Sequence, residues 1–135
     1  MKTAVIYWSG TGNTEQMARA VAEGARAELF SVSDFSGDVA DYDRIAFGCP
    51  SMGDEVLEES EFDPFFSSVE GKLFGKKTAL FGSYGWGDGE WMRKWVDRAK
   101  AAGADIVNGE GFIVNDAPDE AGLAGCRALG EDLVK

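Results

Sequence analysis

The sequence predicts an α/β fold in which helices cover both faces of a doubly wound parallel β-sheet. Two observations support this class. Short apolar runs alternate along the chain with amphipathic stretches, and the apolar runs lack alternating polar residues, as expected for strands buried on both faces. The 135 residues contain no repeat, low-complexity tract or linker, so we expect one domain spanning residues 1–135.

Five strands are expected where β-branched and aromatic residues form continuous runs. In chain order these are Thr3–Trp8, Ala27–Val32, Arg44–Cys49, Lys77–Ser83 and Asp105–Val114, the last weakened by Gly109 and Gly111. Three amphipathic helices are expected at Thr14–Ala25, Glu90–Ala102 and Glu120–Val134. The second has Trp91 and Trp95 at helical spacing, which predicts that both are core residues, and the third is interrupted by three glycines.

Charge and composition exclude several functions. The net charge of −11 repels nucleic acid and anionic membranes and suits basic protein partners, although acidity also serves solubility alone. The absence of His removes Ser-His-Asp and Cys-His catalysis and most transition-metal sites, so no metal site is expected. Cys49 and Cys126 are predicted to be buried thiols. No apolar run approaches the ~20 residues of a membrane span, and the N-terminus does not resemble a secretory signal, so a cytoplasmic location is expected.

In a doubly wound sheet, ligands bind at the carboxyl ends of strands where the winding reverses. The loop after the first strand is "SGTGNT", in which Gly10 and Gly12 allow close backbone approach and Ser9, Thr11, Asn13 and Thr14 supply short donors. It leads into a helix, whose first amides and dipole favour a phosphate. It is neither a P-loop, which needs Lys after the glycines, nor a dinucleotide fingerprint, because Glu15 occupies the last glycine position. A helix start without a ligand is the alternative.

The loop after the third strand begins "PSMGDE". Met52 can lie against a flat ring because its thioether is polarizable, and Gly53 allows its peptide bond with Asp54 to rotate. From Asp54 to Asp63 the chain has six acids and no base, which is either a solvated face or a feature of the site.

The loop after the fourth strand is "SYGWGDG". Glycines around Tyr84 and Trp86 leave room for a planar ligand, whereas Trp86 packed onto the core is the alternative. Together the three loops predict a site for a flat heterocycle with one terminal phosphate, held without a cationic side chain.

The stretches "YWSGTGNT", "GCPSMGDEVLEESEF" and "GKKTALFGSYGWGDGEWM" resemble the flavodoxins, closest to the short-chain type of anaerobic bacteria, and the similarity extends in order over essentially the whole chain. Flavodoxins are themselves the standard example of a five-stranded parallel sheet in the order 2-1-3-4-5. The resemblance implies non-covalent FMN, one-electron transfer rather than enzymatic catalysis, a monomer, and basic redox partners, namely reductases and low-potential electron acceptors.

The resemblance also implies roles for individual residues. The phosphate would be held by the 9–14 loop and the ring flanked by Met52 and Trp86, with the Gly53 carbonyl near flavin N5 in the reduced state. Asp54 and Glu55 would bond the N5/N3 edge and the Ser83–Gly85 backbone the pyrimidine end. The full expected set is Ser9, Gly10, Thr11, Gly12, Asn13, Thr14, Ser51, Met52, Gly53, Asp54, Glu55, Ser83, Tyr84, Gly85 and Trp86. Pro50 departs from members that have Ser there, which removes one phosphate contact.

The absence of a cation near the phosphate and the acidic run should both oppose a second electron on the ring, which predicts a low-potential carrier that cycles between neutral semiquinone and hydroquinone. Three alternative functions fit the sequence less well. A flavodoxin-like FMN-dependent reductase needs room for nicotinamide and substrate, and no inserted segment supplies it. A dedicated ribonucleotide reductase activator typically has different ring loops. A receiver domain needs clustered Asp residues that Tyr7–Ser9 and Cys49–Ser51 do not supply.

Overall fold

The computed structural model describes residues 1–135, and its elements lie within one or two residues of most of the predicted ones. The strands are β1 (Thr3–Tyr7), β2 (Glu28–Ser31), β3 (Arg44–Gly48), β4 (Lys77–Tyr84), β5 (Asp105–Ile106) and β6 (Phe112–Asn115). The α-helices are α1 (Asn13–Ala25), α2 (Phe62–Val69), α3 (Glu90–Ala101) and α4 (Glu120–Leu133). Short 3₁₀ helices lie at Val39–Asp41, Glu70–Lys72 and Val107–Gly109.

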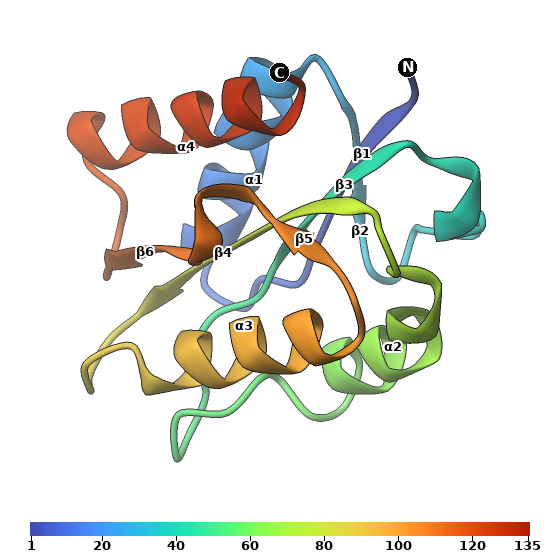
Figure 1. Ribbon diagram of the computed structural model, residues 1–135. Coiled ribbons are helices and arrows are strands. Elements are labelled where there is room, and N and C mark those ends of the chain that lie inside the picture. The colour runs from blue at the N-terminus through green and yellow to red at the C-terminus, as the bar shows by residue number, and fades with distance from the viewer.

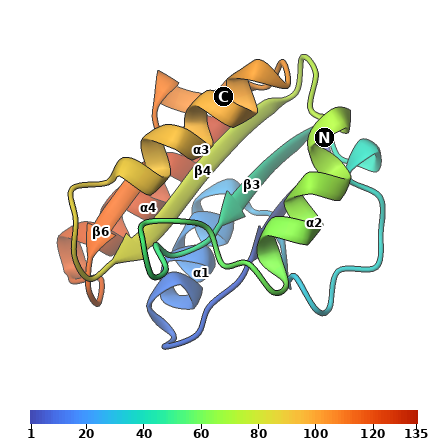
Figure 2. The ribbon, with the colours of Figure 1, turned by 90° about the horizontal axis from the view of Figure 1, so that it is seen from below.

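The sheet is parallel throughout and has the order β2-β1-β3-β4-β5, with β6 also paired to β4. The predicted doubly wound fold and its 2-1-3-4-5 order are therefore confirmed. Helices α1 and α4 cover one face, and α2 and α3 cover the other (Figures 1 and 2). None of the helices is long and apolar enough to cross a bilayer.

Each face of the sheet has its own core. Ile6, Ile45 and Phe47 point toward α2 and α3, where they join the fully buried Trp91 and Trp95 predicted as core residues. Val5, Ala46 and Phe81 point toward α1 and α4. Because neighbouring residues of one strand alternate between the two cores, the central positions of these strands, such as Ala4–Ile6 and Ile45–Phe47, are all apolar.

The glycines of α4 permit close helix packing rather than interrupting the helix. A Cβ on Gly130 would lie 2.1 Å from the carbonyl oxygen of Val21, and one on Gly24 would lie 2.0 Å from that of Arg127. Helices α1 and α4 therefore touch backbone to backbone at two points. A larger residue at either glycine would force them apart.

The prediction of one continuous fifth strand over Asp105–Val114 is wrong. Asn108 and Gly109 have φ of 63° and 75°, so the chain turns out of the extended conformation between β5 and β6. Both strands pair with β4, and residues 107–111 lie opposite only residues 79–80. After residues 107–111 the chain pairs with β4 again, nearer the carboxyl end of β4. The carboxyl ends of β6 and β4 therefore lie at the same edge of the sheet (Figure 1).

Candidate functional site

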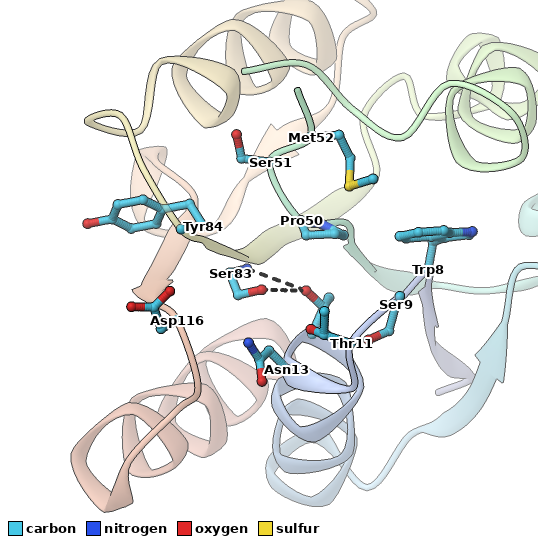
Figure 3. A pocket seen from close by; sticks show the side chains of 13 residues that line it. Trp8, Ser9, Thr11, Asn13, Pro50, Ser51, Met52, Ser83, Tyr84 and Asp116 are labelled. Carbon is cyan, nitrogen blue, oxygen red and sulfur yellow. Dashed lines mark hydrogen bonds between the residues drawn. The ribbon is translucent and has the colours of Figure 1, made fainter. Parts of the chain in front are cut away.

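A cavity of about 250 Å³ lies at the carboxyl ends of β1, β3 and β4, beside the point between β1 and β3 where the strand order reverses (Figure 3). Ten of the fifteen residues expected from the sequence line it: Ser9, Gly10, Thr11, Asn13, Thr14, Ser51, Met52, Ser83, Tyr84 and Gly85. The other five, Gly12, Gly53, Asp54, Glu55 and Trp86, lie outside its wall. Trp8, Pro50 and Asp116 complete the lining.

The loop between β1 and α1 is organised by the Ser9 hydroxyl. Its Oγ accepts the backbone N–H of Gly12 at 3.1 Å and that of Glu15 at 3.2 Å. Gly12 has a φ of 100°, which allows the loop to turn directly into α1. Because Ser9 Oγ acts only as an acceptor in these two bonds, its hydroxyl hydrogen is free to be donated into the cavity.

Among the backbone N–H groups of this loop that have no hydrogen-bond partner in the protein are those of Thr11, Asn13 and Thr14. They belong to the first turn of α1 and the residues before it, where helix geometry provides no intrahelical acceptor and the helix dipole is positive. No Lys or Arg lines the cavity. The donors are therefore neutral, clustered and unused, which fits an anion with several oxygen atoms.

Thr14 and Ser83 connect the start of α1 to β4. Their hydroxyl oxygens lie 3.0 Å apart, and the Ser83 N–H donates to Thr14 Oγ1 at 3.4 Å. Both side chains are buried. The two hydroxyls have two hydrogens and only one lies between them, so whichever group donates, one O–H is left for another acceptor.

The loop after β3 is a tight turn. Met52 and Val56 exchange backbone hydrogen bonds of 2.8 and 3.0 Å, and the three residues between them include Gly53 with φ 45° and Glu55 with φ 56°. Met52 lines the cavity and is 37% exposed. A Cβ on Gly53 would meet nothing within 4 Å, so this peptide has open space around it.

Glu55 lies outside the cavity wall, and its contacts are with the neighbouring loop. Its carboxylate accepts the N–H of Glu90, the first residue of α3, at 3.2 Å. Gly87 lies against the Glu55 carboxyl group and has a φ of 87°, a conformation that favours Gly. Glu55 thus fastens the 52–56 turn to the loop between β4 and α3.

Within that loop Tyr84 and Gly85 line the cavity, whereas Trp86 is 62% exposed. The alternative in which Trp86 packs onto the core is therefore wrong. Tyr84 packs against Trp91 with ring centroids 5.6 Å apart, which anchors the base of the loop.

Three lining residues are absent from the expected set. Trp8 ends the first predicted strand and its side chain could have faced either way. Asp116 follows β6, has φ 58° and donates its N–H to the Tyr84 carbonyl at 2.8 Å. Its signal was the turn-rich "NDAPD" after the fifth apolar run, since that strand also ends at this edge of the sheet. Pro50 was considered only for the hydroxyl it lacks, although its ring forms part of the wall (Figure 3).

Comparison with known proteins agrees with this geometry. The family model described as flavodoxin matches residues 5–130. The chain belongs to the flavodoxin family. It is 47% identical to the flavodoxin of Megasphaera elsdenii over 97% of both chains, and 49% identical to that of Clostridium beijerinckii over 87% of this chain and 88% of the relative. The solution structure of two-electron reduced Megasphaera elsdenii flavodoxin superposes with a TM-score of 0.84 at 44% identity, over 98% of each chain.

The resemblance to short-chain flavodoxins is thus confirmed, and both relatives come from anaerobic bacteria. An archaeal flavodoxin structure has a TM-score of 0.89 at 24% identity, which shows the shared fold. Members of this family are flavin-dependent electron carriers that serve redox partners, and they are not enzymes.

The Glu58 side chain, which follows the 52–56 turn, is held in place by several hydrogen bonds. Glu58 is buried, and its carboxylate accepts the hydroxyl and N–H of Ser60 and the N–H groups of Glu61 and Phe62. Burial opposes ionisation of Glu58, but these hydrogen bonds outweigh it and lower its pKa. Glu58 therefore caps α2 as a carboxylate.

Cys49 and Cys126 are free, buried thiols, as predicted. Burial raises the pKa of both, that of Cys126 to about 12. Cys49 precedes Pro50 and its Sγ accepts the N–H of Glu58 at 3.4 Å. A thiol in this state packs and hydrogen bonds, and it is a poor nucleophile.

Proposed function

We propose that this chain binds FMN non-covalently and carries single electrons at low potential between basic redox proteins of the cytoplasm. When bound, FMN supplies the redox chemistry by cycling between its neutral semiquinone and its hydroquinone. The observation that carries the proposal is the set of unpaired N–H groups, including those of Thr11, Asn13 and Thr14, beside two unused hydroxyl hydrogens in a cavity without a cation.

These donors fit a phosphomonoester. A phosphate dianion accepts several hydrogen bonds from converging donors, and backbone N–H groups at a helix start provide them. A neutral ligand such as riboflavin would leave the same N–H groups without a charged acceptor. The loop is therefore expected to favour FMN over riboflavin.

The Gly53–Asp54 peptide is expected to respond to reduction. Reduced FMN bound here would present an added N–H donor, and a backbone carbonyl of the 52–56 turn that could turn toward it would contribute about 1 kcal/mol net. Gly53 has the open space and the backbone freedom for such a rotation, while the paired Met52 and Val56 keep the base of the turn in place.

Uncompensated acids are expected to keep the second potential low. Of the six acids from Asp54 to Asp63, only Asp63 forms an ion pair, with Arg98 at 2.8 Å. A carboxylate about 12 Å from an added electron opposes it by roughly 0.3–1.4 kcal/mol for effective dielectric constants of ~80 to ~20. Since ~1.4 kcal/mol corresponds to ~59 mV for one electron, several such groups shift the potential substantially.

The same acids would attract basic partners. The exposed apolar side chains of Met52 and Val56 lie in the turn after β3, and that of Trp86 lies in the loop between β4 and α3. A basic partner could therefore bury apolar surface that is surrounded by acidic residues. We expect the carrier to act as a monomer of one domain, residues 1–135.

An anaerobic dithionite titration of the purified protein, followed by visible absorption, tests the proposal. FMN bound as proposed gives a yellow protein that passes through a long-wavelength neutral radical before bleaching. A colourless protein that does not become yellow with FMN would refute it.

A further inference from the structure

The Trp8 indole forms the wall of the cavity beside the phosphate loop (Figure 3). A Cβ on Gly10 would lie 3.1 and 3.3 Å from two carbons of this ring. The Gly10 backbone therefore rests directly on the indole. The position of the ring therefore limits how far the 9–14 loop can shift toward Trp8, and so affects where the unpaired N–H groups of the loop point.

The Trp8 ring is only partly buried. It packs against the core between the sheet and helices α2 and α3, and it also borders a second hollow of about 260 Å³, which Glu15, Ser31, Ser33 and Glu61 line as well. Packing therefore leaves open space beside the indole into which the ring could move.

One hydrogen bond opposes this movement. Trp8 Nε1 donates to Glu61 Oε1 at 3.2 Å. The acceptor is well placed, because the buried Glu58 carboxylate accepts the N–H of Glu61 and that of Phe62, both at 2.8 Å, and so fixes the start of α2. A chain of contacts thus runs from Glu58 through Glu61 and Trp8 to Gly10.

We propose that Glu61 is a positioning residue for the phosphate end of the cavity: by accepting the indole N–H it holds Trp8 beneath Gly10 and keeps the 9–14 loop in its phosphate-binding conformation. The proposal rests on the proposed function and deepens it, because it assigns the residue that makes the loop selective for a phosphorylated flavin.

The charge of Glu61 has the opposite effect on the phosphate. A carboxylate near a dianion weakens its binding, so removal of charge alone should tighten FMN. Loss of the hydrogen-bond acceptor should weaken FMN. The two roles of Glu61 therefore differ in sign and can be separated by substitution.

Four single variants and one double variant of the full chain separate them. Glu61→Ala removes charge and acceptor, Glu61→Gln removes the charge and keeps an acceptor, and Glu59→Ala removes a charge from an exposed neighbour that makes no side-chain hydrogen bond. Trp8→Phe removes the N–H donor together with the outer ring carbons that contact Gly10. The double variant combines Trp8→Phe with Glu61→Ala.

The measurement is the dissociation constant of FMN and of riboflavin with each apoprotein, at one ionic strength. We expect Glu61→Ala to bind FMN about three- to tenfold more weakly than Glu59→Ala does, with a smaller change for riboflavin. Glu61→Gln should match Glu59→Ala, and Glu61→Ala should have no further effect in the Trp8→Phe background.

Equal FMN affinities of Glu61→Ala and Glu59→Ala would overturn the proposal, as would equal losses for the two flavins, which indicate general destabilisation. The wild-type protein provides the separate test of the proposed function. If the wild-type protein does not bind FMN, or binds riboflavin as tightly as FMN, both the proposed function and this inference are refuted. If it binds FMN selectively, the results with the variants test the role of Glu61 alone.

Discussion

Replacing Ser9 by Ala tests the phosphate loop directly. The change removes one hydroxyl that accepts two backbone N–H groups, those of Gly12 and Glu15, and that has its own hydrogen left for a ligand. A hydrogen bond to a charged group contributes about 1.5–3 kcal/mol, so FMN should bind about ten- to 150-fold more weakly. Riboflavin, which has no phosphate to receive that bond, should be nearly unaffected.

The substitution also removes a cap from the start of α1. Losing such a cap costs about 1 kcal/mol, which lowers the melting temperature of the apoprotein by about 4 °C in a chain of this size. Thr14→Ala should act in the same direction on FMN, although it also breaks the buried contact with Ser83.

Titration of each apoprotein with FMN and with riboflavin, followed by flavin fluorescence, measures the selectivity. Ser36→Ala is the matched control, because Ser36 is exposed and its hydroxyl makes no hydrogen bond. If Ser9→Ala weakens both flavins by the same factor, the 9–14 loop does not hold the phosphate and the assignment is refuted.

Three further predictions concern the turn, the α2 cap and the acidic surface. Gly53→Thr places a β-branched residue at φ 45°, at a cost of about 1–2 kcal/mol. This cost should shift the redox couples by ~40–90 mV and so lower the maximal amount of semiquinone in a redox titration. The control is Gly75→Thr, which has a φ of 73° and also has open space around it, and which should leave the potentials unchanged. Since the pKa of Glu58 is lowered in the folded state, its stabilisation is present above its ordinary value of 4.5 and lost as pH falls through the folded value. The urea midpoints of wild type and Glu58→Gln should therefore differ at pH 7 and approach each other as pH falls below 4.5, and a difference that stays constant with pH would contradict this. Electron transfer with a basic reductase should slow severalfold between low and ~0.5 M salt, and a rate independent of salt would count against steering by the acidic surface.

Sequence patterns were sufficient for the central sheet because burial on both faces leaves a continuous apolar run. In β1 and β3 every residue from Ala4 to Ile6 and from Ile45 to Phe47 is fully buried, so the pattern contains no polar interruption. The fifth strand lies at the edge, where only β4 constrains it. There Asn108 and Gly109 have positive φ angles and interrupt a segment whose apolar pattern alone predicted one strand.

Helix α2 was missed for a different reason. It is only eight residues long, and it overlaps the end of the acidic run, because Asp63 lies in its first turn. Its start depends on the Glu58 carboxylate, which reaches forward to the N–H groups of Glu61 and Phe62. A cap formed by a residue four positions before a helix is not evident from periodicity.

The positions of the three loops followed from the sequence, whereas the orientation of their side chains did not. Parallel strands bring their carboxyl ends to one edge, so loops that follow them must meet. The orientation of the Glu55 side chain, by contrast, is set by a tertiary contact, the hydrogen bond that its carboxylate accepts from the Glu90 N–H. Trp8 and Asp116 face the cavity for equally non-local reasons, through Glu61 and through the Tyr84 carbonyl.

The use of backbone donors rather than a cation has a consequence for redox function. A Lys about 4 Å from the phosphate would add roughly 1–4 kcal/mol of attraction at effective dielectric constants of ~80 to ~20, and FMN would bind more tightly. The same charge would cancel part of the phosphate field at the ring and make a second electron easier to add, which raises the potential. In the proposed site, the N–H groups of Thr11, Asn13 and Thr14 would provide affinity through short-range dipoles, whose fields fall off faster with distance than that of a full charge. A chain with net charge −11 and no cation in its cavity would thus bind an anion and still retain the negative potential that the proposed low-potential carrier requires.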